Sequence, residues 1–325
     1  MSTYLLSVDD LRADALFRAG EPQSSSSSFW VKSLDYLNRI QRQLAIGGAI
    51  AVGRDLATVA GIYTQVVTVP LTDYWWLRKL GVFTTTAAIT NLTVTATEGS
   101  ATATLSAAPS TNLEGWRIQI STLPTVPRIV SHSGTSITLD APWPEDTQTG
   151  ATCNIFDVEY ALPPDFLRFA SAPYVHSTFA APIPVSSRRQ LHIDYPWAHM
   201  TQGRPTKAFL TGPRTLQVNT FDNRGYRYEF EYIGMPADLQ AGGEPVLPMH
   251  QRPVLASGVA MLILHDKNDS RAETMASEYR EWIQRMMQEH RRSLGAGSTS
   301  YGVHRVRSRG WIQRQVQPEG ELFLT

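Results

Sequence analysis

The spacing of apolar residues changes twice along this 325-residue chain, and one type of secondary structure cannot satisfy both spacings. Near both ends, apolar side chains recur every three or four positions, which is the period of a helix with one buried face. Between the ends the period falls to two, which is typical of half-buried strands. We therefore expect an α+β fold, with a bundle of about four helices, two N-terminal and two C-terminal, interrupted by antiparallel β structure.

The N-terminal region predicts two helices. Ser7 and Asp10 have the spacing of a capping box, and Gly20 is placed to end the helix that they begin. A second apolar stripe of helical period follows Phe29 and ends at Gly47. The acidic residues of the first helix also argue against a secretory signal at the start of the chain.

The C-terminal region predicts two further helices. Pro253 is suited to the first turn of a helix that we expect to run to about Asp266. Ser270 and Glu273 repeat the capping-box spacing before a long amphipathic stretch. Each of the four helices has an apolar face that needs a partner, so the simplest arrangement packs them together.

The central region predicts many short strands. One strand is expected from Ile62 to Pro70, and residues 84–160 contain six alternating runs separated by glycines, which predicts a small inserted β-sandwich or barrel. A second, irregular β region follows. The predicted strands are Leu92–Thr97, Ala101–Leu105, Trp116–Ser121, Arg128–Ser131, Ser136–Asp140 and Thr152–Tyr160 in the insert, then Gln190–Asp194, Lys207–Thr211, Arg214–Asn219 and Arg227–Ile233.

These patterns divide the chain into six parts. The predicted parts are the N-terminal half of the helical body at 1–60, a connecting strand and aromatic junction at 61–83, the inserted β domain at 84–160, the second β region with a Pro-rich linker at 161–250, the C-terminal half of the helical body at 251–294, and an extended basic arm at 295–325. The arm has too few apolar residues to fold alone.

Composition excludes several classes of protein. The 29 basic and 29 acidic residues cancel, and the pI near 7.1 gives no global attraction to nucleic acid or to an anionic membrane. The longest apolar run is far shorter than a membrane span. With Cys153 as the single cysteine, neither a disulfide framework nor a multi-cysteine metal cluster can form.

Charge is nevertheless uneven. Seven arginines and three glutamates follow from residue 285 onward, so this end carries a net charge of +4. A basic, tryptophan-bearing arm is suited to docking on an acidic protein surface, although weak binding to DNA phosphates is the alternative. The residues expected to dock are Arg305, Arg307, Arg309, Trp311, Ile312 and Arg314.

The chain contains no recognisable catalytic or cofactor motif. Glycine-rich phosphate loops and the common hydrolase and zinc-protease motifs are absent from the sequence, so we expect no enzyme activity, cofactor or metal. Glu229 and Glu231 share one face of a predicted strand and resemble a glycosidase pair, but we interpret them as a solvated strand face opposite buried aromatic residues. His192, Asp194 and His199 lack a credible full set of metal ligands.

Two further features have both a functional and a structural interpretation. Cys153 lies in a predicted strand with no neighbouring histidine, so we interpret it as a small buried residue and not as a nucleophile. Trp75 and Trp76 precede Arg78 and Lys79, an arrangement that can stack on bases or sugars. We favour the structural interpretation, an aromatic plug where the helical body meets the β insert.

Several phrases of the sequence together resemble the head-to-tail adaptor, or connector, proteins of tailed bacteriophages. The phrases are LRADAL at 11–16, WVKSLDYLN at 30–38, YWWL at 74–77, GWRI at 115–118, IVS at 129–131, SITL at 136–139, YALPPDF at 160–166, YEFEY at 228–232, MPADL at 235–239 and PVLP at 245–248.

The resemblance implies a structural virion protein of the phage neck, assembled in the host cytoplasm. It implies a homo-oligomeric ring, twelve-fold in the family, that docks under the portal ring by the C-terminal arm, seals the neck and offers a platform to the next tail or nozzle protein. Genomic DNA would pass through the lumen without sequence-specific binding, and no membrane is involved.

Two other functions stay open at this point. The inserted β domain could bind a host-surface glycan through Trp116 or Trp143, as a tail or spike component would. The chain could instead be a virion glycosidase that uses Glu229 and Glu231.

Overall fold

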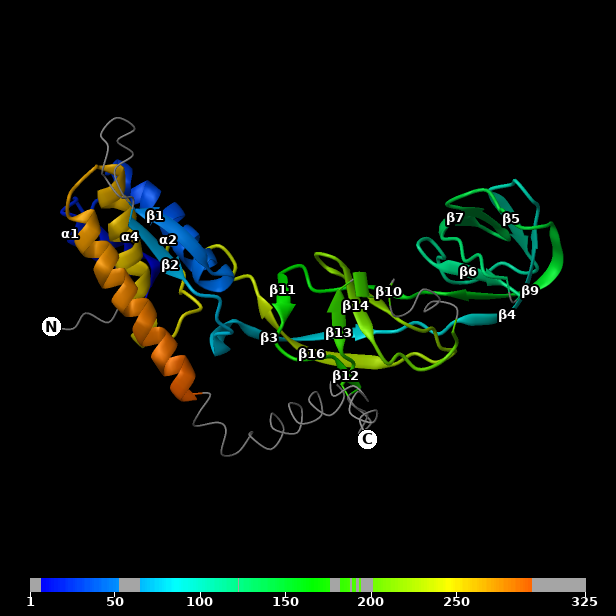
Figure 1. Ribbon diagram of the computed structural model, residues 1–325. Helices are drawn as coiled ribbons and strands as arrows, with labels where there is room; N and C mark the ends of the chain where they lie inside the picture. Colours follow the sequence, from blue (N-terminus) through cyan, green and yellow to red (C-terminus); the bar gives the residue numbers. More distant parts are fainter. Residues whose placement is uncertain are drawn as a thin grey trace, which may run out of the picture. The chain divides into compact units, whose positions relative to one another are not determined.

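The chain folds into two compact units in a computed structural model, which describes residues 7–52, 65–121, 123–175, 182–187, 189–190, 193 and 201–293 (Figure 1). The first unit contains Met1–Leu77 and Met235–Thr325, and we call it the helical unit. The second contains Arg78–Gly234, and we call it the strand unit. The molecule is therefore α+β, with four helices in the described part of the helical unit and several mainly antiparallel sheets, as the change in apolar spacing predicts.

The two N-terminal helices begin and end where the sequence predicts. Helix α1 (Val8–Ala19) begins with the predicted capping box, in which Ser7 and Asp10 each accept the backbone N–H of the other, and ends at Gly20 with a φ of 69°. Helix α2 (Ser28–Ile46) follows Ser27, whose hydroxyl accepts the Phe29 amide, and ends before Gly47. The capping and stop residues thus fix both helices locally.

Arg12 joins these two helices from a buried position. Its side chain on α1 is almost fully enclosed, yet its guanidinium donates to the hydroxyl of Ser33 on α2 at 3.1 Å and to the backbone carbonyl of Trp30. The guanidinium also lies 4.1 Å from the centre of the Trp30 ring and pairs with Asp9 at 2.9 Å. These partners offset the cost of burying a charge.

Helix α4 (Pro253–Asp266) is the most buried element of the helical unit. Pro253 occupies the first turn, as expected, and every residue from Val254 to Leu264 is buried. A helix that is apolar on all sides needs neighbours on all sides. Helix α4 contacts both α1 and α2, and the hydroxyl of Ser257 donates to Glu278 in the next helical segment at 2.9 Å.

Residues 272–293 form a further helix at the end of the described chain. Its buried side chains include Ala276, Tyr279, Ile283 and Met286, which confirms the predicted apolar stripe. The predicted cap is wrong, because Asp269 accepts the Arg271 amide at 2.9 Å one position before Ser270. Asp and Ser are comparable caps, so spacing alone does not select between neighbours.

Gly258 sets how closely the helices around α4 approach one another. A Cβ at this position would lie 3.1 Å from carbons of both Ile40 on α2 and Tyr279. We expect Gly258→Leu to lower the free energy of unfolding by about 1–3 kcal/mol, because the added carbons have no space. We expect Gly258→Ala to stay within about 1 kcal/mol, since better helix propensity offsets the tight contact.

Urea denaturation followed by far-UV circular dichroism measures both Gly258 variants. A Gly258→Leu chain that unfolds at the same urea concentration as the unsubstituted chain would contradict this packing.

A two-stranded sheet completes the helical unit. Strand β1 (Gly48–Val52) pairs antiparallel with β2 (Gln65–Val69), and the short helix η1 (Trp75–Leu77) follows. The second strand lies within the predicted Ile62–Pro70 segment, of which residues 62–64 are outside the described chain, whereas β1 was not expected. The short helix η3 (Met249–Gln251) directly precedes α4.

The strand unit contains a six-stranded antiparallel sheet that curls into a half-barrel. The strand order is β6-β9-β4-β5-β8-β7, and a bridge between Arg117 and Arg128 joins the two edge strands. Its core is apolar throughout, with Trp143 and Ile137 among the fully buried side chains. The strands are β4 (Ile89–Ala96), β5 (Thr102–Leu105), β6 (Arg117–Ile120), β7 (Ile129–Ser133), β8 (Ser136–Leu139) and β9 (Gln148–Phe156), which confirms the first five predicted runs. The sixth, Thr152–Tyr160, is wrong as a single strand, because β9 ends at Phe156 and the chain continues into β10 (Glu159–Ala161) of another sheet.

Two four-stranded sheets share the second core of this unit. One has the order β10-β15-β14-β13, with β13 parallel to β14. In the other, β16 lies centrally, with β3 on one side and both β11 and β12 on the other. The bounds are β3 (Arg78–Thr84), β10 (Glu159–Ala161), β11 (Phe166–Phe169), β12 (Tyr174–Val175), β13 (Val185–Ser187), β14 (Ala208–Gly212), β15 (Thr215–Val218) and β16 (Arg227–Gly234).

Asp165 connects the two long strands β3 and β16. Its carboxylate accepts from Lys79 at 2.6 Å and from the Tyr232 hydroxyl at 2.9 Å. Burial opposes the charged form, but these two bonds prevail and lower the pKa of Asp165. Burial and the bond to Asp165 raise the pKa of Tyr232 to about 12. The phrase YALPPDF therefore has a structural role here.

The strand predicted at Gln190–Asp194 is wrong. The two described residues of that segment, 190 and 193, are helical. An apolar–polar alternation over five residues also fits one turn of helix, so the period was too short to decide. The remaining predicted strands of the second β region correspond to β14, β15 and β16.

Candidate functional site

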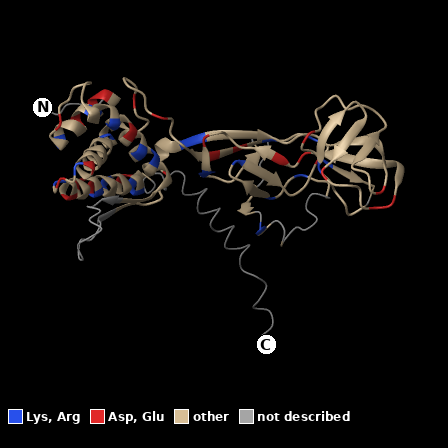
Figure 2. Ribbon diagram, turned by 90° about the horizontal axis from the view of Figure 1, so that it is seen from above, with Lys and Arg blue, Asp and Glu red and all other residues tan. Residues whose placement is uncertain are grey.

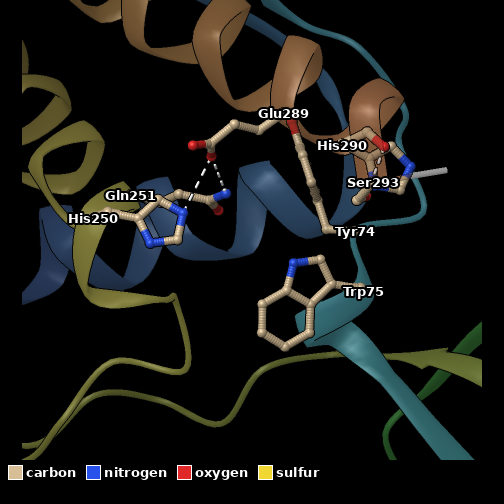
Figure 3. Close-up of a pocket in the computed structure, with 7 residues that line it drawn as sticks. All are labelled: Tyr74, Trp75, His250, Gln251, Glu289, His290 and Ser293. Atoms are coloured by element: carbon tan, nitrogen blue, oxygen red, sulfur yellow. Dashed lines mark hydrogen bonds and ion pairs between the residues drawn. The ribbon is translucent and has the colours of Figure 1, made fainter. Parts of the chain in front are cut away.

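A pocket in the helical unit gathers the polar and aromatic side chains that come closest to a functional site. Its volume is about 220 Å³. The lining residues come from three segments: the end of the loop before η1, the η3 turn, and the C-terminal helix (Figure 3). They are Tyr74, Trp75, His250, Gln251, Glu289, His290 and Ser293.

Glu289 is the polar centre of this pocket. Figure 3 shows its side chain reaching from the C-terminal helix toward His250 and Gln251. One carboxylate oxygen, Oε2, accepts from Gln251 Nε2 at 2.8 Å and lies 3.2 Å from His250 Nε2. Gln251 is only 5% exposed, whereas the carboxyl side chain of Glu289 is about half exposed at 48%. The pocket is therefore anchored by a buried amide and open at the carboxylate.

Aromatic rings form the other side of the pocket. Tyr74 is buried, stacks on Trp76 with 5.4 Å between ring centroids and meets the His290 ring edge-on at 5.6 Å. Burial raises the pKa of Tyr74, so its hydroxyl is protonated at neutral pH. Trp75 is 57% exposed. The neighbouring tryptophans thus differ, because Trp76 belongs to the core and Trp75 offers an accessible ring.

The cations beside the two tryptophans are already paired. Lys79 contacts Asp165, and Arg78 lies 3.7 Å from Glu231. A platform for single-stranded nucleic acid needs cations that can reach phosphates. Because Arg78 and Lys79 are each paired with a carboxylate, the YWWL phrase is unlike a platform for single-stranded nucleic acid.

The predicted arm residues lie outside the described part of the chain. This applies to Arg305, Arg307, Arg309, Trp311, Ile312 and Arg314, and also to His192, Asp194 and His199. Among the residues that are described, no three His, Cys, Asp or Glu side chains are grouped as metal ligands.

The glutamate pair on β16 does not have the environment of a glycosidase site. Glu229 is 7% exposed and lies 3.5 Å from Arg227, while Glu231 is exposed beside Arg78. The expectation of a solvated face is wrong for Glu229, because β16 is a central strand with β3 and β12 beside it. Both carboxylates are in ion pairs, which favours a structural role.

The two tryptophans proposed for glycan binding are buried in the half-barrel. Trp116 is 7% exposed and Trp143 is 1% exposed. A ring that stacks on a sugar must present a face to solvent. The assignment of a glycan site to these two residues is therefore wrong, since both rings fill the core of the six-stranded sheet.

Cys153 is buried in the same core, as predicted. Burial raises the pKa of its thiol to about 11, and Sγ donates to the Leu92 carbonyl at 3.4 Å. We expect iodoacetamide at pH 8 to label the folded chain at least about 100-fold more slowly than the urea-unfolded chain, because the thiolate is the reactive form. Mass spectrometry measures the labelling, and equal rates in both states would contradict a buried thiol.

The comparisons with known proteins give no further assignment. No protein-family model matches the chain, and no curated protein matches its sequence. None of the helices in the described ranges is long and apolar enough to cross a bilayer. The site must therefore be interpreted from its own chemistry.

Sequence reasoning identified only part of this pocket. It named Trp75 and Trp76 together as a stacking platform, of which only Trp75 is exposed, and it missed the cluster of His250, Gln251 and Glu289. Glu289 is 38 positions from Gln251, and no short motif connects them. The contact exists only because η3 and the C-terminal helix pack side by side.

Proposed function

We propose that this chain is a head-to-tail adaptor of a tailed bacteriophage, a structural virion protein that docks under the portal ring. In this proposal the four helices pack as a bundle that repeats around a ring, twelve-fold as in the family it resembles. The C-terminal arm engages the portal, and the β structure faces the next tail or nozzle protein. Genomic DNA passes through the lumen, and the protein has no turnover chemistry.

The observation that carries the proposal is the exposure of large apolar side chains on the helical unit. Phe17, Val31, Ile46 and Leu71 are each 50% exposed or more. A Cβ added at Gly47, the residue after Ile46, would lie 3.1 Å from the backbone of Leu71. Ile46 and Leu71 therefore belong to one region. Exposed apolar groups that gather in one region mark surfaces that associate with other proteins.

The charge distribution supports a protein partner. Figure 2 shows basic and acidic residues interspersed along the helices. Several of these charges are paired within the helical unit: Arg18 contacts both Asp14 and Glu278, and Arg42 contacts Asp238. Binding to DNA along this unit would need unpaired cations in a continuous row.

Co-sedimentation with phage heads tests the proposal. We expect the full chain to pellet with heads that contain portal and to stay in the supernatant with heads assembled without portal. Equal pelleting with both kinds of head would remove the portal as the docking partner, and no pelleting with either would contradict the adaptor function.

A further inference from the structure

The pocket around Glu289 presents hydrogen-bond acceptors that lack donors. Gln251 Oε1 is buried and has no hydrogen-bond partner among the described residues. The amide cannot be turned around, because Gln251 Nε2 donates to Glu289 and the reverse orientation would place two acceptors together. Leaving a buried acceptor unpaired is costly. A ligand that donates a hydrogen bond to this oxygen would remove that cost, so the pocket favours a donor.

The same pocket favours a positive charge. Among the described residues, the polar contacts of Glu289 are to His250 and Gln251, and both involve Oε2, which leaves Oε1 to face the pocket opening. The nearby helix cation Arg285 is engaged elsewhere, 3.6 Å from Glu281 and 5.0 Å from the centre of the Trp282 ring. An exposed carboxylate that no lysine or arginine of the described residues contacts attracts a cation from outside the pocket.

The volume of the pocket and its flat aromatic wall favour a ligand the size of one side chain, with a planar charged group. Pockets that hold drug-sized molecules measure about 300–1,000 Å³, whereas this one measures about 220 Å³. The exposed ring of Trp75 gives a flat surface on which a guanidinium can stack. An arginine satisfies several acceptors at once and stacks, which the ammonium group of a lysine does less well.

We propose that this pocket binds an arginine side chain from the chain's own C-terminal segment. The described chain ends at Ser293, which itself lines the pocket. Arg305, Arg307, Arg309 and Arg314 follow in sequence, and Arg305 is 12 positions from Ser293. Twelve extended residues span up to about 40 Å, so these arginines can return to the pocket of the same subunit.

This inference goes beyond adaptor function, because it concerns where the arm is held before any partner is bound. A tethered ligand has an effective concentration in the millimolar range. A partner that takes the arm must therefore first displace an arginine from this pocket. Binding of the arm in this pocket keeps the basic segment from binding other molecules non-specifically before assembly.

Fluorine NMR of the full chain labelled with 5-fluorotryptophan tests the inference. The Trp75 resonance is identified by its loss in Trp75→Phe. We compare the unsubstituted chain with a chain in which Arg305, Arg307, Arg309 and Arg314 are all replaced by lysine, which keeps the charge. We expect the Trp75 resonance to shift between these two chains, and the shift to disappear when both also carry Glu289→Gln.

A small probe provides the second readout. We expect N-acetyl-arginine methylamide to shift the Trp75 resonance of the four-lysine chain, and to bind the unsubstituted chain about tenfold more weakly because the pocket is occupied. The matching lysine compound should bind at least about tenfold more weakly than the arginine compound. Glu289→Gln should reduce probe binding by a similar factor.

Three results would overturn the inference. If neither the arginine substitutions nor the probe moves the Trp75 resonance, the pocket holds water only. If the probe binds both chains equally, the pocket takes an arginine but not one from this segment. If the lysine probe binds as well as the arginine probe, the pocket selects charge and not a guanidinium. None of these results depends on portal, so adaptor function is tested separately.

Discussion

Removal of residues 295–325 is expected to abolish attachment to portal-containing heads while leaving both compact units folded. The segment carries four arginines and Trp311, which are the residue types that contribute most at protein interfaces. Many copies around a ring multiply the effect, because each arm binds at the high local concentration set by its neighbours. Co-sedimentation measures attachment, and circular dichroism measures folding.

The matched control keeps the composition of the segment and changes its order. A chain with residues 295–325 in scrambled order has the same net charge and the same aromatic content. If attachment depends on specific docking, this chain should bind at least about 100-fold more weakly than the unsubstituted chain. A truncated chain that still decorates portal-containing heads would contradict the role given to the arm.

Replacement of Trp143 by alanine is expected to lower the free energy of unfolding of the strand unit by about 3–5 kcal/mol. The ring is 1% exposed within the half-barrel core, and its Nε1–H donates to the Asp146 carbonyl at 3.2 Å. The substitution removes a large apolar volume and one partly buried hydrogen bond. Urea denaturation followed by tryptophan fluorescence measures the change.

Val130→Ala is the control for this substitution. Val130 lies on β7 of the same sheet but is 50% exposed, so its truncation should change stability by no more than about 0.5 kcal/mol. Equal effects at the two positions would contradict the packing of the half-barrel. A Trp143→Ala chain with unchanged stability would reopen the question of a surface function for this residue.

Local signals explain why much of the fold is predictable from the sequence. The capping box of Ser7 and Asp10, the stop at Gly20 and the proline at the start of α4 act through neighbouring backbone groups, and all three were found where expected. Strands of the half-barrel were predictable because alternating burial and turn glycines repeat at short intervals. The packing of the helices as one bundle stays a prediction.

Strand β3 shows what local signals cannot supply. Its segment begins with Arg78 and Lys79 and has Gly81 in its interior, which is a weak pattern for a strand. It is a strand because it pairs with β16 over seven residues. Gly81 is required there, since a Cβ would lie 2.4 Å from the Phe230 ring. The residue that requires a glycine at position 81, Phe230 on β16, is thus nearly 150 positions away in the sequence.

The candidate site was less predictable than the fold for a similar reason. An exposed tryptophan can be proposed from sequence, but the acceptors beside it depend on a contact between η3 and the C-terminal helix. The burial of Glu229 likewise depends on strands that flank β16 on both sides. Polar residues acquire their roles from neighbours that are distant in sequence.

The most direct test of adaptor function is the mass of the purified chain, alone and after mixing with purified portal rings, measured by native mass spectrometry. The account predicts a subunit of about 36.1 kDa in isolation and a complex in which a fixed number of copies joins each portal ring. Twelve copies per portal ring would match the proposed symmetry. A mixture in which both components keep their separate masses would contradict the account.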